Sequence, residues 1–338
     1  MMKIKKFLAI KMLTLVSMTI ISSAPGMSVV DNMSFSGYGT AGNISKTNNV
    51  RPELAFDWMG RAQYYKDRFG TVLSFNQVSE RRSGYLQDLF LFFDVGSGRI
   101  EVGHTNSVGQ KLGVGLPDAG GLRINQSMMA YGLIDNPNVI ATPSVNSSAN
   151  KPRVAYVARP SDFLQYGFGA ATGYGDMDFG ADAGIRLRGG EAVKYGLSFG
   201  VSHIINPDGL LAEIYAPRVT ADSRSEGALG INIQYNSWSI GLVGKAIYDY
   251  NPAGRPSDGI MYGAGGAYEF LSWRASLNVL RSDTAVWRDC DYGGCANTTV
   301  LTSVQNKLDE IVDLWASFGR VIGDESFNFW SVSLRAKF

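Results

Sequence analysis

Arginine side chains that could attract or orient a charged solute recur within segments that are otherwise rich in apolar residues. Arg186 and Arg188 alternate with apolar neighbours, and Arg61, Arg99 and Arg153 occupy similar positions in other segments. In a β-strand, successive side chains point to opposite faces, so these arginines are expected on a polar face opposite an apolar one. The chemistry that such residues offer is electrostatic, because fixed charges beside a water-filled passage discriminate among solutes.

Residues that could catalyse a reaction or bind a metal are scarce. The chain contains 2 histidines, His104 and His203, and a hydrolase would need a Ser/His/acid set around one of them. His203 falls on an apolar face close to the end of a strand, where an interfacial ring is the ordinary explanation. Cys290 and Cys295 lack the partner ligands of a metal site. We therefore predict that the protein is not an enzyme and has no cofactor and no metal.

The composition excludes several classes of protein. The chain has 338 residues, of which 45% are hydrophobic and 18% are charged, with 40 Gly, 17 Phe and 16 Tyr. A disordered chain would have fewer aromatic and more charged residues. No segment reaches the roughly 18 consecutive apolar residues of a membrane-spanning helix. The net charge of +1 does not suggest a nucleic-acid partner.

The first residues have the pattern of an export signal. Four lysines among residues 3–11 precede the apolar run 12–21, and small residues follow it. This order is typical of a cleaved secretory signal peptide, so we predict a signal over residues 1–26 and the mature protein over 27–338. Since an exported protein meets an oxidising environment, we also expect Cys290 and Cys295, which lie in a turn-rich segment, to form a local disulfide.

Most of the remaining chain alternates apolar and polar residues with a period of two. A soluble β-sandwich would alternate as well, but two features favour a transmembrane antiparallel β-barrel. The segments are about ten residues long, which is the length that crosses a bilayer at a tilt, and aromatic residues lie at many segment ends, as at the two membrane interfaces. Short and long connections also alternate, as they do at the two rims of such barrels.

The alternation delimits fifteen segments, and a barrel with both chain ends at one rim needs an even number. We therefore predict 16 strands and place the missing one between Thr299 and Ser326, while treating Thr284–Val304 as a long connection. The fifteen predicted segments are 34–44, 54–65, 71–79, 85–95, 99–105, 152–159, 163–173, 179–188, 193–204, 227–235, 239–249, 260–269, 273–282, 309–318 and 327–338.

The C-terminal segment and the region around residues 96–173 together resemble a known family. The chain ends with an alternating apolar face that closes on an aromatic residue, formed by Trp330, Val332, Leu334, Ala336 and Phe338. This pattern resembles the terminal signal by which outer-membrane proteins are recognised by the barrel-insertion machinery. Residues 96–104 resemble the turn and strand that precede the third loop of the Gram-negative porins, and residues 153–160 resemble the strand that follows that loop.

The resemblance to the porins implies that this chain forms a trimeric, sixteen-stranded diffusion channel whose third loop folds into the barrel. Residues 106–150 have about the length of that loop. The implied constriction places loop acids opposite basic residues of the wall. In this chain the loop acids would be Asp118 and Asp135, and the wall residues would be Arg61, Arg99, His104, Arg153, Arg186 and Arg188. His104 stands where many members carry arginine, and Asp118 replaces the more usual glutamate.

The sequence thus predicts an outer-membrane porin that lets small hydrophilic solutes and ions diffuse through a water-filled channel, with membrane lipid and two identical subunits as its partners. Two alternatives stay open. The first is a channel specific for anions or sugars, and the second is a plugged barrel with a structural or adhesive role. The segment 106–150 distinguishes them, because a loop folded inward filters solutes whereas a loop folded outward is displayed.

Overall fold

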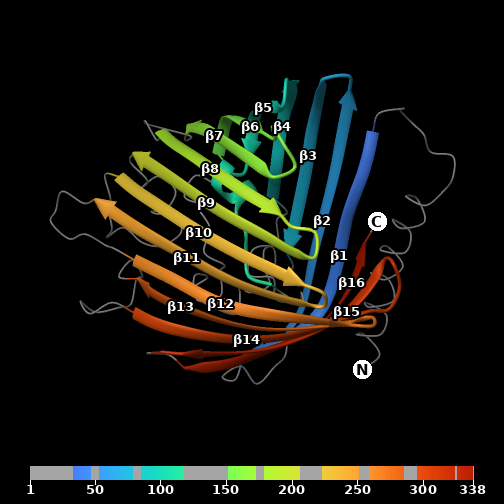
Figure 1. Cartoon of the computed structure of the whole chain (residues 1–338). Helices are drawn as coiled ribbons and strands as arrows, with labels where there is room; N and C mark the ends of the chain where they lie inside the picture. Colours follow the sequence, from blue (N-terminus) through green and yellow to red (C-terminus); the bar gives the residue numbers. More distant parts are fainter. Residues whose placement is uncertain are drawn as a thin grey trace.

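The computed structural model describes residues 33–46, 53–78, 85–117, 151–172, 179–205, 223–250, 259–284, 295–323 and 326–337. They form a closed β-barrel in which every strand pairs antiparallel with its neighbours in the sequence, and β1 pairs with β16 to close the ring (Figure 1). Closure removes the free sheet edges and pairs backbone groups with a neighbour on both sides of each strand. Within the described ranges, no helix is long and apolar enough to cross a lipid bilayer.

The strands follow one another around the barrel as a simple meander. Their bounds are β1 Met33–Lys46, β2 Glu53–Lys66, β3 Phe69–Val78, β4 Tyr85–Val95, β5 Gly98–Thr105, β6 Lys151–Ala158, β7 Leu164–Thr172, β8 Phe179–Gly189, β9 Val193–Ile205, β10 Ser223–Tyr235, β11 Trp238–Tyr250, β12 Gly259–Phe270, β13 Trp273–Thr284, β14 Cys295–Lys307, β15 Val312–Ile322 and β16 Phe327–Lys337. One short helix, α2 (Val108–Leu112), follows β5.

The predicted number of 16 strands is confirmed. The strand missing from the sequence prediction is β14, Cys295–Lys307, which extends into the expected range but begins within the segment predicted as a long connection. That part of the prediction was wrong because both faces of β14 mix polar and apolar residues. Thr299 and Ser303 point inward and are buried, whereas Thr302 points outward, so the apolar period is weak.

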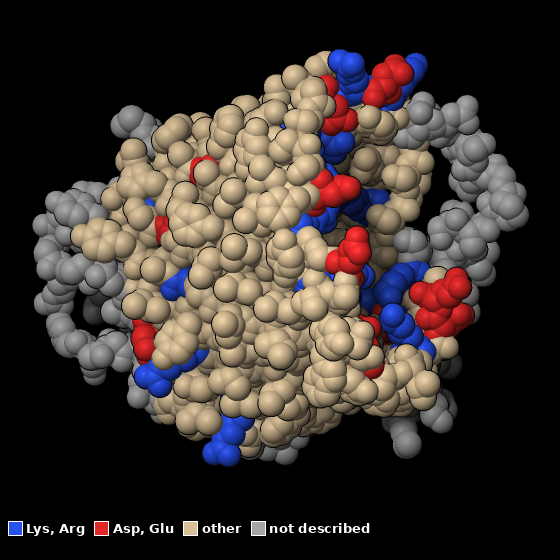
Figure 2. Space-filling view, in the orientation of Figure 1, with Lys and Arg blue, Asp and Glu red and all other residues tan. Residues whose placement is uncertain are grey.

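The two faces of the wall differ as the alternation predicts. In β4, Leu89, Leu91 and Phe93 point outward and are 44%, 51% and 49% exposed, whereas the inward-facing Asp88 and Phe92 are buried. Figure 2 shows the same division over a wide area, because the visible outer wall is almost free of charged residues and the charges gather mainly at one edge. This edge corresponds to the short turns at the right in Figure 1.

The short turns bring consecutive strands together at one rim. Asp67, Gly96 and Asn236 lie in three of these turns and have positive φ angles of 56°, 59° and 49°. This left-handed conformation is favourable for Gly and tolerated by Asp and Asn, so the sequence supplies suitable residues for tight reversals. The turn at Gly96–Gly98 agrees with the one predicted there.

Several predictions concern residues outside the described ranges. These are the signal peptide over 1–26, the loop acids Asp118 and Asp135, Cys290, and Phe338 of the C-terminal signal. Cys295 begins β14, but its side chain is not described, so the disulfide stays a prediction. Trp330 and Val332 of the C-terminal pattern are 39% and 45% exposed on the outer face of β16.

Candidate functional site

The segment that follows β5 turns into the barrel and lies against the inner wall. Ser107 caps α2 by accepting a hydrogen bond from the Gln110 backbone N–H at 3.2 Å. The chain then continues to Pro117 across the inner side of the strands β8 to β11, where Figure 1 shows it behind them. Residues 106–117, which we call the inner segment, are the described beginning of the predicted inward loop.

Glycines in the wall make room for the inner segment. A Cβ atom built on Gly230 would lie 1.9 Å from the Val114 carbonyl oxygen, and one built on Gly241 would lie 2.5 Å from Cδ of Pro117. Both distances are shorter than any real carbon contact, so only glycine allows this close approach of two backbones. The inner segment therefore lies in a shallow track that the sequence of the wall creates.

Arg186 of β8 binds the end of helix α2 from the wall. Its Nε donates to the Leu112 carbonyl at 2.7 Å and its Nη2 donates to the Gly113 carbonyl at 2.6 Å. The last carbonyls of a helix have no partner within the helix, and a guanidinium offers several donors in a fixed plane. Arg186 thus stabilises the inner segment through backbone carbonyls rather than through a carboxylate.

A buried ion pair lies beneath the start of the inner segment. Arg153 of β6 reaches Asp182 of β8 with Nη2 and Oδ2 3.3 Å apart, and neither side chain is exposed. β7 lies between these strands, and its Gly169 leaves the space in which the two side chains meet. Asp182 also accepts the backbone N–H of Val108 at 2.5 Å, so the same carboxylate connects the wall to the helix.

Apolar contacts fix the inner segment at both of its ends. Val108 and Leu112 of α2 pack against Ala155 of β6, and all three are buried. Farther along, Leu116 packs against Val243 and Leu280, which belong to β11 and β13. These contacts bury apolar surface, which contributes roughly 25 cal/mol for each Å² removed from water. The inner segment is therefore part of the packed structure of the wall.

Lys111 of α2 forms an ion pair with Glu101 of β5, beside the ring of Phe90. Burial lowers the pKa of Lys111 from its usual value because the charged ammonium loses hydration, and the nearby Glu101 carboxylate opposes this shift. The positive charge on the inner segment is therefore held in place at a cost in solvation.

We expect the stability of the barrel, relative to a Lys111→Met variant, to rise with pH in the alkaline range. The unfolded chain keeps its Lys111 proton up to the ordinary lysine pKa, whereas the folded chain releases the proton earlier, so deprotonation favours the folded state. Urea unfolding of both proteins at neutral and alkaline pH measures this difference. An equal pH dependence in the two proteins would contradict it.

Other inward-facing charges are paired along the wall. Lys245 and Glu226 are buried and lie 3.0 Å apart between Nζ and Oε2. Where β15, β16 and β1 meet, the Arg335 guanidinium lies 4.1 Å from the centre of the Tyr38 ring and 3.8 Å from that of Trp315. Such cation–π contacts hold a guanidinium flat against the wall.

The structure places the predicted wall arginines in inward-facing rows, but in different environments. Arg99 pairs with Asp94 at 2.7 Å near the rim with the short turns, and Arg188 donates to the Asp162 carbonyl at 3.1 Å in the neighbouring turn. Arg61 is an exposed residue opposite Ser74. Among the predicted arginines, the structure brings Arg153 and Arg186 together at the inner segment.

His104 does not belong to this inward-facing set, and this part of the prediction was wrong. It pairs with Leu89, whose side chain is exposed on the outer face, while the neighbouring Thr105 is buried on the inner face. The physical reason is the period of the strand. Arg99 and His104 are five positions apart, so a regular strand cannot present both on one face.

Acidic wall residues are the main feature that the sequence prediction missed. Asp182, Glu101 and Glu226 are all buried, and each pairs with a cation on the inner face. Their place on the inner face could have been predicted by counting alternate residues along each strand. Their partners could not, because the partners lie on other elements. Within the described ranges, the carboxylates that pair with basic residues of the inner face are therefore acids of the wall, whereas the loop acids predicted from the porin resemblance lie outside those ranges.

One short pattern in β9 matches a hydrolase motif but lacks its context. Gly196–Gly200 reads Gly-Leu-Ser-Phe-Gly, the G-x-S-x-G pattern of a nucleophile elbow, which requires a sharp strand-to-helix turn. Here Ser198 lies in the middle of the strand and its Oγ accepts the Val114 N–H at 2.7 Å. His203 of the same strand points to the outer face. Ser198 thus positions the inner segment, and no group of metal-binding side chains gathers within the described ranges.

Comparison with solved structures identifies the class of fold. The chain has the fold of the outer-membrane porins, over nine-tenths of its length. No protein-family model and no curated protein sequence matches the chain.

Three solved structures illustrate the likeness. The loop-deletion variant of OmpT, an outer-membrane protein of Vibrio cholerae, is 13% identical, with 90% of this chain and 99% of that one covered and a TM-score of 0.64. The anion-selective porin of Comamonas acidovorans is 8% identical, with 90% and 99% covered and a TM-score of 0.62. OmpF of Salmonella typhi, solved with daunomycin, is 11% identical, with 91% and 98% covered and a TM-score of 0.65.

Proposed function

We propose that this protein is a non-enzymatic outer-membrane channel through which small hydrophilic solutes and ions diffuse passively. The single observation that carries the proposal is the division of the barrel wall. Its outer face is apolar over a wide band, and its inner face is lined with polar and charged residues and holds the inner segment. A closed barrel of this size leaves an aqueous passage, and an apolar outer band is what hydrocarbon requires.

The proposal also covers the oligomeric state, export and membrane insertion of the protein. Two solved structures with this fold are named as porins, and one OmpT structure is named as a trimer. We propose a homotrimer surrounded by outer-membrane lipid, exported by the predicted signal over residues 1–26 and inserted through its C-terminal strand. The barrel-insertion machinery would recognise the outward face that ends at Phe338.

The inner segment is proposed to begin the constriction that selects solutes by size and charge. It is fastened to the wall by Arg186, Asp182 and Ser198, so the loop that continues from Pro117 starts inside the barrel. Asp118 follows Pro117 directly, and we propose that it lines the passage. Arg186 interacts with backbone carbonyls rather than with a carboxylate, which supports some preference for anions.

The experiment that tests the proposed function is single-channel recording in a planar lipid bilayer. We expect discrete conductance steps that grow with salt concentration, and a reversal potential in a salt gradient that reports the charge preference. A purified, folded protein that inserts into the bilayer without conducting would contradict the channel and would favour the plugged barrel.

Replacing Asp118 by Asn should shift the selectivity of the channel toward anions. A charge at a narrow, partly dehydrated site acts more strongly than in bulk water, and the shift should fade at about 1 M salt, where the Debye length is about 3 Å. Reversal potentials at low and high salt measure the effect. A reversal potential equal to that of the unmodified protein at low salt would show that Asp118 does not line the passage.

We expect Cys290 and Cys295 to be joined in the mature protein. Mass spectrometry of unreduced peptides should find them in one linked species, and two free thiols would contradict the expectation. The effect on unfolding should be small, because the bridge would close only a short loop.

A further inference from the structure

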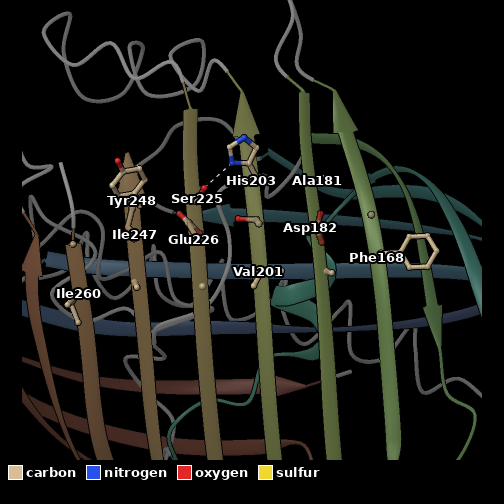
Figure 3. A pocket seen from close by; sticks show the side chains of 16 residues that line it. Phe168, Ala181, Asp182, Val201, His203, Ser225, Glu226, Ile247, Tyr248 and Ile260 are labelled. Atoms are coloured by element: carbon tan, nitrogen blue, oxygen red, sulfur yellow. Dashed lines mark hydrogen bonds between the residues drawn. The ribbon is translucent and has the colours of Figure 1, made fainter. Parts of the chain in front are cut away.

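The outer wall has a hollow of about 940 Å³ over the strands β7 to β12 (Figure 3). Its floor follows one row of paired residues formed by Ala183, Val201, Gly227 and Ala246 on β8 to β11. Apart from Val201, these side chains are no larger than a methyl group, and a Cβ atom on Gly227 would meet nothing within 4 Å. The same row ends in two large residues, Phe168 on β7 and Ile260 on β12.

A polar pair lies in the next row of this hollow. His203 of β9 and Ser225 of β10 point outward, with Nδ1 and Oγ 2.9 Å apart. Figure 3 shows this pair beside Tyr248 and close to the strand ends that lead into residues 206–222. Both residues lie two positions from a strand end, which is about 7 Å along a strand. They are thus placed at the edge of the apolar band.

We propose that this hollow binds one phosphorylated membrane lipid, with an acyl chain along the apolar floor and the phosphate against His203 and Ser225. The inference rests on the proposed membrane location. Imidazole and hydroxyl groups donate hydrogen bonds to phosphate oxygens. The volume lies within the range of small-molecule sites, and an apolar floor suits hydrocarbon.

The shape of the hollow favours a lipid chain over a second barrel. Phe168, Ile260 and Tyr248 are 59%, 58% and 51% exposed at its margins. The convex wall of another subunit would rest on these side chains and leave the floor unfilled, whereas a single flexible chain can pass between them. A protein interface needs about 800 Å² of closely packed surface on each partner.

Native mass spectrometry of the full-length protein, stripped of lipid in detergent, tests the proposal with two probes. Phosphatidylglycerol offers both chains and phosphate, and diacylglycerol with the same chains lacks the phosphate. Ala246→Phe fills the floor, whereas Ala316→Phe adds the same ring on the exposed outer face of β15 and serves as the matched control. A third variant combines His203→Ala with Ser225→Ala.

We expect Ala246→Phe to weaken retention of both lipids by about tenfold, and the His203/Ser225 variant to weaken phosphatidylglycerol alone by about tenfold. Ala316→Phe should bind both like the unmodified protein. Equal binding by all variants would overturn the proposal, as would a change of oligomeric state in Ala246→Phe without any bound lipid. Conductance recorded on the unmodified protein distinguishes failure of this inference from failure of the proposed function. Intact conductance without lipid binding contradicts only this inference.

Discussion

Replacing Gly230 by Ala should lower the single-channel conductance, whereas the same replacement at Gly227 should leave it unchanged. Both glycines belong to β10, but a Cβ atom at Gly230 would lie 1.9 Å from the Val114 carbonyl oxygen, while at Gly227 it meets open space. The Val114 carbonyl belongs to the backbone and cannot rotate away as a side chain could. The inner segment must therefore move from the wall toward the passage, which narrows it.

The displaced segment should also lose part of its attachment. Ser198 accepts the Val114 N–H at 2.7 Å, and this hydrogen bond would lengthen as the backbone moves. Overpacking of this kind costs about 1–3 kcal/mol. Planar-bilayer recordings of both variants, with urea unfolding of each in lipid vesicles, measure the two effects. If Gly230→Ala and Gly227→Ala conduct alike, the inner segment does not border the passage.

Replacing Asp182 by Asn should destabilise the barrel strongly, by about 3–5 kcal/mol. The substitution keeps the shape of the side chain and an oxygen that can accept the Val108 N–H, but it removes the charge that faces Arg153. Because neither side chain of the pair is exposed, water cannot replace the lost partner. Arg153 would then stay buried beneath the inner segment without the carboxylate charge of Asp182.

The matched control is Asp283→Asn. Asp283 forms an ion pair with Arg281 at 3.2 Å, and these two side chains are 43% and 44% exposed. An exposed pair contributes about 0–1 kcal/mol, so this variant should unfold nearly like the unmodified protein. Urea unfolding in vesicles compares the two. Equal unfolding free energies for Asp182→Asn and Asp283→Asn would show that burial does not decide the strength of the pair.

The inner and outer faces of most strands could be predicted from the sequence, because side chains of successive residues in a strand point to opposite faces. The parity count placed Arg61, Arg99, Arg153, Arg186 and Arg188 on one face without any tertiary information, and the structure has them in inward-facing rows. His104 was misplaced because resemblance to other proteins was given more weight than the same count.

The strand β14 could not be found by alternation because both of its faces mix polar and apolar residues. Thr299 and Ser303 face the inner side, and Thr302 faces outward, where the hydroxyl donates to the Phe318 carbonyl at 3.1 Å. Pairing with β13 and β15 stabilises this strand, and that pairing is a property of the closed sheet rather than of the segment. A segment without a clearly apolar face can therefore form a strand that its local sequence pattern does not predict.

The sequence by itself determined the class of fold and the direction of most side chains, since both depend on local period and on residues suited to turns. The number of strands followed from the even number that a barrel with both chain ends at one rim requires. Only the tertiary structure decided which side chains meet. Arg153 and Asp182 are joined across Gly169 of an intervening strand, and the inner segment lies over glycines of strands distant in the sequence. Such contacts depend on the register between strands and on the path of the chain inside the barrel, and no local pattern specifies either.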